Sequence, residues 1–196
     1  MEWILASQSP RRKELFGELV ENFTVLPAKG EERAPKGVTP SKLVETLAAQ
    51  KAREIAALPQ AKDCGVLGSD TVVALDGEIL GKPKDTADAK RMLTALSGRA
   101  HQVYTGICFS IPDGNGGRRE WIDAACTNVY FNRLSEREID EYIATGSPMD
   151  KAGAYGIQDG GLVERIEGSF SNVVGLPVEL CKETLKKIKT DRAGMR

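Results

Sequence analysis

The 196-residue sequence has few of the side chains that many metal and hydrolase sites require. His101 is the only histidine, which argues against a histidine-rich metal centre and leaves little room for a Ser-His-Asp triad. No cysteine belongs to a Cys-x-x-Cys pair, so a zinc site is not expected either. We expect the cysteines to be small buried hydrophobic residues in a reducing compartment: Cys64, Cys108, Cys126 and Cys181.

Several larger features are also absent. No apolar run approaches the ~20 residues of a membrane span and no signal peptide precedes Trp3, so we expect a cytoplasmic protein without a membrane partner. The formal net charge is −1 and there is no basic block, which argues against a long nucleic acid as partner. The glycine-rich phosphate loops of P-loop enzymes and dinucleotide-binding proteins are missing, as is the Gly-x-Ser-x-Gly elbow.

The beginning of the chain, in contrast, concentrates hydroxyl and cationic groups. Trp3–Ala6 predicts a buried strand, and Ser9 and Pro10 predict the cap and first residue of a helix over about 10–20. The helix dipole disfavours cations in a first turn by ~0.3–1 kcal/mol each. Three occur there: Arg11, Arg12 and Lys13. Free backbone N–H groups beside guanidiniums favour a phosphate site; the alternative is a capped helix with a solvated basic start.

Periodicity and turn signals predict an alternation of strands and helices along the rest of the chain. Further strands are expected over residues 23–27, 64–68, 72–75, 78–80, 100–112, 118–131 and 162–166. Further helices are expected over 40–58, 86–96 with Thr86 as cap, 139–145 after a capping box at 135–138, and 177–188. Two glycine-containing loops are expected over 150–161 and 167–175. His101, at the start of a strand, is expected to make a structural hydrogen bond.

Two charged residues lie in apolar surroundings. Lys51 falls on the apolar stripe of the second helix, where it either reaches water or meets an anion. Asp70 is expected between a strand that ends at Gly68 and one that begins at Val72, and Lys82 returns towards it after an Asp-Gly hairpin. A carboxylate in such a place indicates function, although an Asx-turn is the competing interpretation.

These charged and polar residues together resemble a phosphate-handling site. The candidates are Ser7, Arg11, Arg12, Glu32, Lys51, Asp70, Thr71, Lys82 and Gln158. Magnesium takes one or two protein carboxylates and shares its remaining positions with water and phosphate, so Glu32 and Asp70 would suffice as metal ligands. The cations would neutralise the charge that develops as a phosphoanhydride breaks.

Several ordered motifs resemble the Maf family, collinearly from residue 3 to about residue 188. They are Leu5–Arg12, Ser69–Val73, Gly81–Pro83, Ser97–His101, Tyr104–Gly106, Lys151–Gln158 and Asn172–Pro177. The resemblance implies an α/β fold in which a long twisted mixed sheet is flanked by helices, with two lobes, a central cleft and a relation to the inosine triphosphatase architecture. It implies one such domain over residues 1–188, and we expect a frayed tail over 189–196.

The resemblance also implies an activity. Maf proteins hydrolyse nucleoside triphosphates to the monophosphate and pyrophosphate with a divalent metal, Mg²⁺ or Mn²⁺. The positions of Arg12, Thr71 and Gln158 match the branch that acts on dTTP and UTP, and modified pyrimidine nucleotides are further candidate substrates of this house-cleaning reaction. A carboxamide such as Gln158 complements the O4 acceptor and N3–H donor of uracil. Asp159 follows it where glycine is expected, and Gln8 is unusually bulky.

Roles follow by the same resemblance. Asp70 matches the proton acceptor, and with Lys82, Lys51 and Glu32 forms the expected catalytic set. Ser7, Arg11, Arg12, Thr71 and Gln158 are the expected substrate-binding set. Alternatives are a nucleotide-binding regulator of septum formation that needs no catalysis, and a purine nucleotide sanitiser. A homodimer through exposed antiparallel strands is a further expectation.

Overall fold

The computed structural model describes residues 1–35 and 37–193. This part of the chain contains one seven-stranded mixed sheet with strand order β2-β1-β3-β5-β6-β7, to which β4 adds by pairing with β3. β1 is parallel to both of its neighbours, and the other pairs are antiparallel. The strands are β1 (Trp3–Leu5), β2 (Phe23–Val25), β3 (Gly65–Leu75), β4 (Glu78–Leu80), β5 (Ala100–Pro112), β6 (Arg118–Phe131) and β7 (Val163–Glu167).

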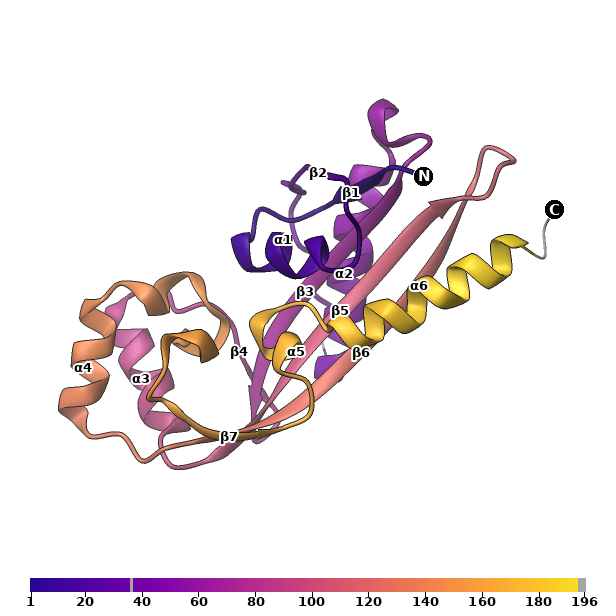
Figure 1. Cartoon of the computed structure of the whole chain (residues 1–196). Coiled ribbons are helices and arrows are strands. Elements are labelled where there is room, and N and C mark those ends of the chain that lie inside the picture. Colours follow the sequence, from indigo (N-terminus) through magenta and orange to yellow (C-terminus); the bar gives the residue numbers. More distant parts are fainter. Residues whose placement is uncertain (36, 194–196) are drawn as a thin grey trace.

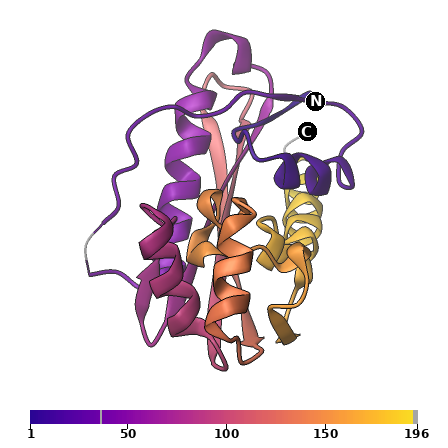
Figure 2. The ribbon, with the colours of Figure 1, turned by 90° about the vertical axis from the view of Figure 1, so that its left-hand side faces the viewer.

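Helices cover both faces of the sheet, with α2 on one face and α1 and α6 on the other (Figures 1 and 2). The helices are α1 (Pro10–Gly17), α2 (Pro40–Ala56), α3 (Thr86–Leu96), α4 (Glu136–Ala144), α5 (Phe170–Val174) and α6 (Val178–Ala193). Four short 3-10 turns complete the chain: η1 (Pro59–Ala61), η2 (Ser147–Asp150), η3 (Ala152–Ala154) and η4 (Ile157–Asp159). Within the described residues, we find no helix with both the length and the apolar character needed to cross a bilayer.

The molecule has two lobes joined by the long strands β3, β5 and β6 (Figure 1). In one lobe α3 and α4 enclose an apolar core that includes Leu93 and Val129. In the other lobe Phe16 of α1, Leu67 of β3 and Phe109 of β5 share a separate core with α6. The strands alternate sides as the period of two requires, so the opposite face of β3 packs against α2.

α2 lies unusually close to the sheet because two strand glycines lack side chains. A Cβ atom on Gly68 of β3 would lie 2.2 Å from the carbonyl oxygen of Ala48, and one on Gly106 of β5 would lie 2.3 Å from that of Val44. The backbones of helix and strand therefore meet directly. This contact brings the middle of α2 against the middle of β3, where Asp70 lies.

Most predicted elements are confirmed. β5 and β6 have the predicted bounds, Ser9 caps α1 by accepting a hydrogen bond from the Arg12 N–H, and Ser135 forms the predicted capping box with Glu138. The cap of α3 was wrongly predicted. Asp85 and not Thr86 is the N-cap, and its carboxylate accepts from the Asp88 N–H.

The break predicted within residues 68–72 is wrong, because β3 is continuous from Gly65 to Leu75. The polar triplet from Ser69 to Thr71 indicates a turn when it is considered alone. β5 pairs with β3 from Val66 to Ala74, and this uninterrupted ladder keeps the triplet extended. Asp70 therefore lies in mid-strand.

The end of the chain also differs from the prediction. α5 is a short helix where a loop was expected, and its N-cap is Ser169. α6 continues beyond Ile188 to Ala193, so the beginning of the predicted frayed tail is helical; residues 194–196 lie outside the described part. All four cysteines are free as expected, but Cys126 is exposed and not buried because it lies on the wetter face of β6.

Candidate active site

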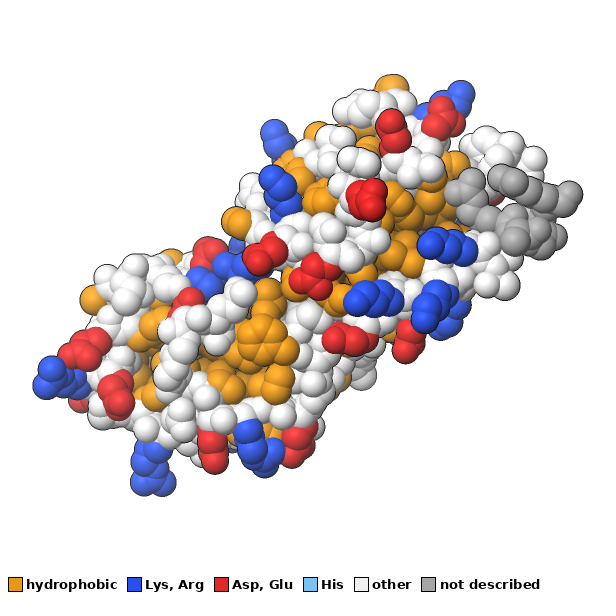
Figure 3. Space-filling view, viewed as in Figure 1, with side chains coloured by type: hydrophobic (Ala, Val, Ile, Leu, Met, Phe, Trp, Pro, Cys, Tyr) orange, Lys and Arg blue, Asp and Glu red, His pale blue; other side chains and the backbone are white. Residues whose placement is uncertain are grey.

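A cleft of about 550 Å³ lies between the lobes, at one edge of β3. β1 pairs with Gly65–Leu67 and β4 with Val73–Leu75, so in the described structure residues 68–72 of β3 have no strand partner on that side. The open edge exposes Asp70 and Thr71 to the cleft. Lysine, arginine and acidic side chains gather at the junction of the lobes in the space-filling view (Figure 3).

The cleft collects nearly all of the predicted site. Eight of the nine candidates line it: Arg11, Arg12, Glu32, Lys51, Asp70, Thr71, Lys82 and Gln158. The ninth, Ser7, supports the cleft from beside it, since its hydroxyl accepts hydrogen bonds from Arg12 Nη1 at 3.4 Å and from the Ser9 N–H at 3.2 Å. Residues from the first third of the chain thus meet residues from its last quarter.

Lys51 is the centre of a compact charged group on the α2 side. Its ammonium lies 2.5 Å from Asp70 Oδ1 and 2.9 Å from Glu32 Oε1. The Lys51 and Asp70 side chains are 17% and 12% exposed, whereas Glu32 is 53% exposed. Of the two alternatives for Lys51, water or an anion, the second is correct, because its ammonium contacts two carboxylates. Low exposure strengthens the Lys51–Asp70 interaction relative to a surface ion pair.

Arg12 joins three segments at the floor of the cleft. Its guanidinium donates to the Gly175 carbonyl at 2.8 Å, to Thr71 Oγ1 at 3.0 Å and to Ser7 Oγ at 3.4 Å. Thr71 is fixed in turn by a 3.0 Å contact with the hydroxyl of Thr105. Burial lowers the pKa of Arg12, and the charge of Asp70 opposes that shift. A guanidinium pKa is so high that Arg12 remains cationic.

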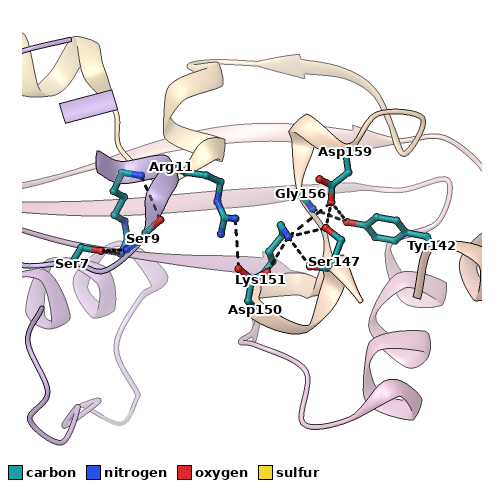
Figure 4. Close-up of polar contacts among 10 residues, drawn as sticks. Ser7, Ser9, Arg11, Tyr142, Ser147, Asp150, Lys151, Gly156 and Asp159 are labelled. Atoms are coloured by element: carbon teal, nitrogen blue, oxygen red, sulfur yellow. Dashed lines mark hydrogen bonds and ion pairs between the residues drawn. The ribbon is translucent and has the colours of Figure 1, made fainter. Parts of the chain in front are cut away.

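The opposite side of the cleft carries charges of both signs (Figure 4). Arg11 of α1 reaches across to Asp150, with 3.6 Å between Nη1 and Oδ2. Lys151 lies 2.9 Å from Asp150 Oδ1 and 4.0 Å from Asp159 Oδ2. Within the described residues, Lys82 lines the cleft without an ion-pair partner. The cleft therefore presents several cations to an incoming anion.

The turn that carries Gln158 is held by α4 (Figure 4). Tyr142 accepts a hydrogen bond from the Gly156 N–H at 3.0 Å and donates one to Asp159 Oδ2 at 2.5 Å. Burial, together with the Asp159 contact, raises the pKa of Tyr142, so its hydroxyl stays a donor. Burial works against ionisation of Asp159, but hydrogen bonds from Ser147 and Tyr142 lower its pKa overall.

Sequence reasoning missed three charged residues of the cleft wall: Asp150, Lys151 and Asp159. They lie in the glycine-dense segment that was expected to approach a ligand, and in it only Gln158 was assigned a role. Three charges within ten residues of a glycine-dense segment are the signal that could have identified them. Tyr142 carries no comparable signal, because it resembles an ordinary apolar-face residue of α4.

His101 is structural, as predicted. It is fully buried, its Nε2 lies 2.8 Å from the hydroxyl of Tyr155, and its ring packs edge-on against Phe131. Its Nδ1 has no hydrogen-bond partner among the described residues. Burial lowers the pKa of His101 to about 4, so the imidazole is neutral at pH 7. Tyr155 lines the cleft, which links this buried pair to the wall around Gln158.

Glu32 and Asp70 have the chemistry expected of ligands for a divalent metal. Both carboxylates contact the one ammonium of Lys51, which brings them to the same part of the cleft. Among the described residues no group of three or more histidine, cysteine or acidic side chains converges to hold a metal. Two carboxylates fit Mg²⁺, which completes its shell with water and substrate phosphate oxygens.

The arrangement can bind a polyphosphate and supply a base. Cations on both sides of the cleft match the negative charge of a triphosphate, and Gln158 lines the same cleft with both a donor and an acceptor for a base edge. Asp70 Oδ1 is occupied by Lys51, and Oδ2 makes no hydrogen bond within the described part of the chain. That oxygen is available to accept a proton.

Comparisons with known proteins agree with this geometry. The chain is 46% identical to the dTTP/UTP pyrophosphatase of Agathobacter rectalis, over 96% of this chain and 98% of the relative. It is 49% identical to the enzyme of the same name from Citrifermentans bemidjiense, over 89% of each chain. A HAM1 protein of Coxiella burnetii shares the fold, with a TM-score of 0.54 and 17% identity over 95% of this chain and 99% of that one.

The family assignment rests on nearly the whole chain. The family described as Maf-like protein matches residues 2–188, which include both walls of the cleft and every predicted site residue. The chain belongs to the Maf family.

Proposed function

We propose that this protein hydrolyses dTTP and UTP to the nucleoside monophosphate and pyrophosphate, with Mg²⁺ or Mn²⁺ as cofactor. The observation that carries the proposal is the meeting of Lys51 with Asp70 and Glu32 at the open edge of β3, in a cleft lined by further cations. The names of the relatives support the substrate class. Modified pyrimidine nucleotides are included as further substrates.

In the proposed reaction water attacks the α-phosphorus and the bond from that phosphorus to the bridging oxygen breaks. Asp70 accepts the proton of the water, and Lys51 holds the carboxylate in place through Oδ1. Arg11 and Lys82 bind the departing pyrophosphate, whose negative charge grows as the bond breaks. A cation bound by Glu32 and Asp70 would supply further charge neutralisation and a more acidic water.

Gln158 and Thr71 both line the cleft, and we assign them to the nucleotide base. The Gln158 carboxamide can donate to O4 and accept from N3–H of uracil or thymine. Cytosine presents the opposite pattern at these two atoms, which the carboxamide matches only after its oxygen and nitrogen exchange places, so discrimination requires one fixed orientation of Gln158. A purine is larger. We therefore expect dTTP and UTP to be hydrolysed in preference to CTP and ITP.

The test is a substrate panel with separate measurement of both phosphate products. Purified protein is incubated with dTTP, UTP, CTP, ITP and 7-methyl-GTP in the presence of MgCl₂, MnCl₂ or EDTA. We expect pyrophosphate from dTTP and UTP with either metal, and loss of turnover in EDTA. Release of orthophosphate would contradict the reaction, and preference for ITP or 7-methyl-GTP would contradict the substrate class. Binding without turnover under either metal would favour a regulator.

The homodimer and the cytoplasmic location belong to the same proposal. The long β5–β6 pair carries the exposed side chain of Ile122 on its surface. Light scattering after gel filtration distinguishes a dimer of about twice 21.2 kDa from a monomer.

A further inference from the structure

The turn that presents Gln158 is closed by a side chain from another helix. Gly156 and Asp159 flank Ile157 and Gln158. A backbone hydrogen bond of 3.1 Å runs from the Asp159 N–H to the Gly156 carbonyl. The hydroxyl of Tyr142, on α4, bridges the same two residues by accepting from Gly156 at 3.0 Å and donating to Asp159 at 2.5 Å. One phenol thus ties both ends of the segment that carries Gln158.

A second layer of contacts fixes the Asp159 carboxylate (Figure 4). Ser147 Oγ donates to Asp159 Oδ2 at 2.6 Å. Lys151 Nζ donates to the Ser147 carbonyl at 2.6 Å and to Ser147 Oγ at 2.9 Å. Because Lys151 supplies the hydrogen to Ser147, the serine hydroxyl is free to give its own hydrogen to Asp159. The four side chains form one connected network.

Downstream of Asp159 the chain is next held at Gly161, whose carbonyl accepts a hydrogen bond from Asn132 Nδ2 at 3.0 Å. Gly160 and Gly161 follow at once, with φ of +77° and +74°, and glycine adds conformational freedom and no packing. The Gln158 residue itself is exposed, and within the described residues its side chain makes no hydrogen bond. The position of the carboxamide therefore depends on how firmly Tyr142 and Asp159 hold the turn.

We propose that Tyr142 and Asp159 are positioning residues that set base selectivity by fixing the Gln158 turn. The inference rests on the proposed function, because selectivity is defined for a pyrimidine nucleotide. Two hydrogen bonds to a base edge require donor and acceptor to be placed within tenths of an ångström. A turn released from Tyr142 loses that placement, so the preference for uracil over cytosine falls. The phosphate chemistry at Asp70 and Lys51 is on the other side of the cleft and stays intact.

The main test is Tyr142→Phe, which removes the hydroxyl and keeps the ring that packs in the lobe core. We expect the ratio of kcat/KM for UTP to that for CTP to fall about three- to tenfold, the range for loss of one or two hydrogen bonds. The fall should come from a higher KM for UTP with kcat little changed. Tyr130→Phe is the matched control, because its hydroxyl donates to Glu167 on the β6–β7 pair, away from the Gln158 turn.

A change in selectivity could also follow from general loosening of the lobe, and three further variants separate the two causes. In a Gln158→Ala background, Tyr142→Phe should have no further effect on the UTP to CTP ratio. Asp159→Asn keeps an oxygen that accepts from Tyr142 and Ser147 and should retain most of the selectivity, whereas Asp159→Ala should lose it. A ratio unchanged in Tyr142→Phe, or an equal fall in the Gln158→Ala background, would overturn the inference.

Failure of the proposed reaction remains distinguishable from failure of this inference. If the unaltered protein releases no pyrophosphate from any nucleotide, the proposed function fails. Calorimetric binding of non-hydrolysable UTP and CTP analogues then measures the same ratio without turnover. Equal binding ratios in the unaltered protein and in Tyr142→Phe would contradict the positioning role, and a ratio that falls in Tyr142→Phe alone would support it.

Discussion

The two walls of the cleft are built in different ways. On the α2 wall, Lys51 and Asp70 belong to a long helix and a long strand whose backbones touch at Gly68. On the opposite wall, Gln158 belongs to a 3-10 turn of three residues, held by hydrogen bonds from side chains such as Tyr142. The first wall, the α2 wall, is fixed by backbone packing. The second, called the turn wall, is the segment around Gln158 and is fixed by a polar network.

This difference suits the two tasks of the proposed reaction. Proton transfer requires a base held within tenths of an ångström of the attacking water, which regular elements in direct contact provide. Recognition of a base can be altered by changes in a turn without moving those elements. Reaction and selectivity are therefore separable here.

The largest effect is expected on the α2 wall. Asp70→Asn keeps the shape of the side chain but removes the base, and the kcat for UTP should fall about 10²- to 10⁴-fold. The UTP to CTP ratio should remain, since the Gln158 turn is untouched. Asp76→Asn is the control, because Asp76 lies in the hairpin after the same strand and pairs with Arg99, outside the cleft lining. Near-normal turnover by Asp70→Asn would remove Asp70 from the mechanism.

Behind the turn wall, His101 should make stability depend on pH. Its folded pKa is about 4, below the ordinary 6.5. As the pH falls below 6.5, His101 is protonated in the unfolded chain but stays neutral in the folded chain. The free energy of unfolding therefore decreases until about pH 4. The full loss is about 3 kcal/mol. Urea unfolding at pH 7.5 and pH 5 measures the part of this loss reached by pH 5, about 2 kcal/mol.

The matched variant for this pH effect is His101→Gln, which cannot take up a proton in this range. Since His101 is the only histidine, the variant should lose most of the decrease between pH 6.5 and pH 5. An equal decrease in both proteins would assign the effect to carboxylates instead.

A smaller effect is expected from Gly68→Ala, which acts on the contact beneath the α2 wall. The new methyl would lie 2.2 Å from the Ala48 carbonyl oxygen and 2.7 Å from the Ala52 nitrogen, so α2 must move outward. We expect a loss of about 1–3 kcal/mol in unfolding free energy. Lys51 lies between those two alanines, so kcat should fall as well, while the UTP to CTP ratio stays unchanged.

Gly17→Ala is the control for that experiment, because among the described residues a Cβ there would meet Phe23 alone, at an ordinary 3.9 Å. Its stability and kcat should match those of the unaltered protein. A fall in selectivity in Gly68→Ala would show that the two walls are coupled through the sheet. Reaction and selectivity would then not be separable.

The sequence predicted the α2 wall well and the turn wall poorly, for physical reasons. Lys51 stands out because it interrupts an apolar stripe, and Asp70 because it lies between two apolar segments. Local pattern could not show that β3 continues through Asp70, since the ladder with β5 pairs Asp70 with the distant Gly106. Strand continuity there is a tertiary property.

The turn wall gives no periodic signal. Gln158 could be assigned only through family resemblance, and the contact between Tyr142 and Asp159 spans 17 residues of irregular chain. Asp159 was noted as a departure from the expected glycine, but its partners Ser147 and Lys151 could not be inferred. Networks of side chains in 3-10 turns obey no fixed spacing, so they become visible only in three dimensions.

The smallest effect is expected at the 3.6 Å ion pair between Arg11 of α1 and Asp150, which lies on the same side of the cleft as the Gln158 turn. The side chains are 30% and 63% exposed, so the pair itself contributes about 0–1 kcal/mol. A triphosphate must compete with Asp150 for Arg11. Asp150→Asn should therefore lower the KM for UTP about two- to fivefold at low salt, with kcat unchanged, and the difference should shrink as salt is added.

Asp140→Asn is the control for Asp150→Asn, since Asp140 pairs with Lys90 on the α3–α4 surface. Its KM should not change. A higher KM in Asp150→Asn would mean that the pair holds the lobes in the binding arrangement and does not compete with substrate. The Arg11–Asp150 ion pair would then link the two sides of the cleft, in addition to the backbone packing and the polar network. Selectivity and turnover should in that case decline together in Asp150→Asn.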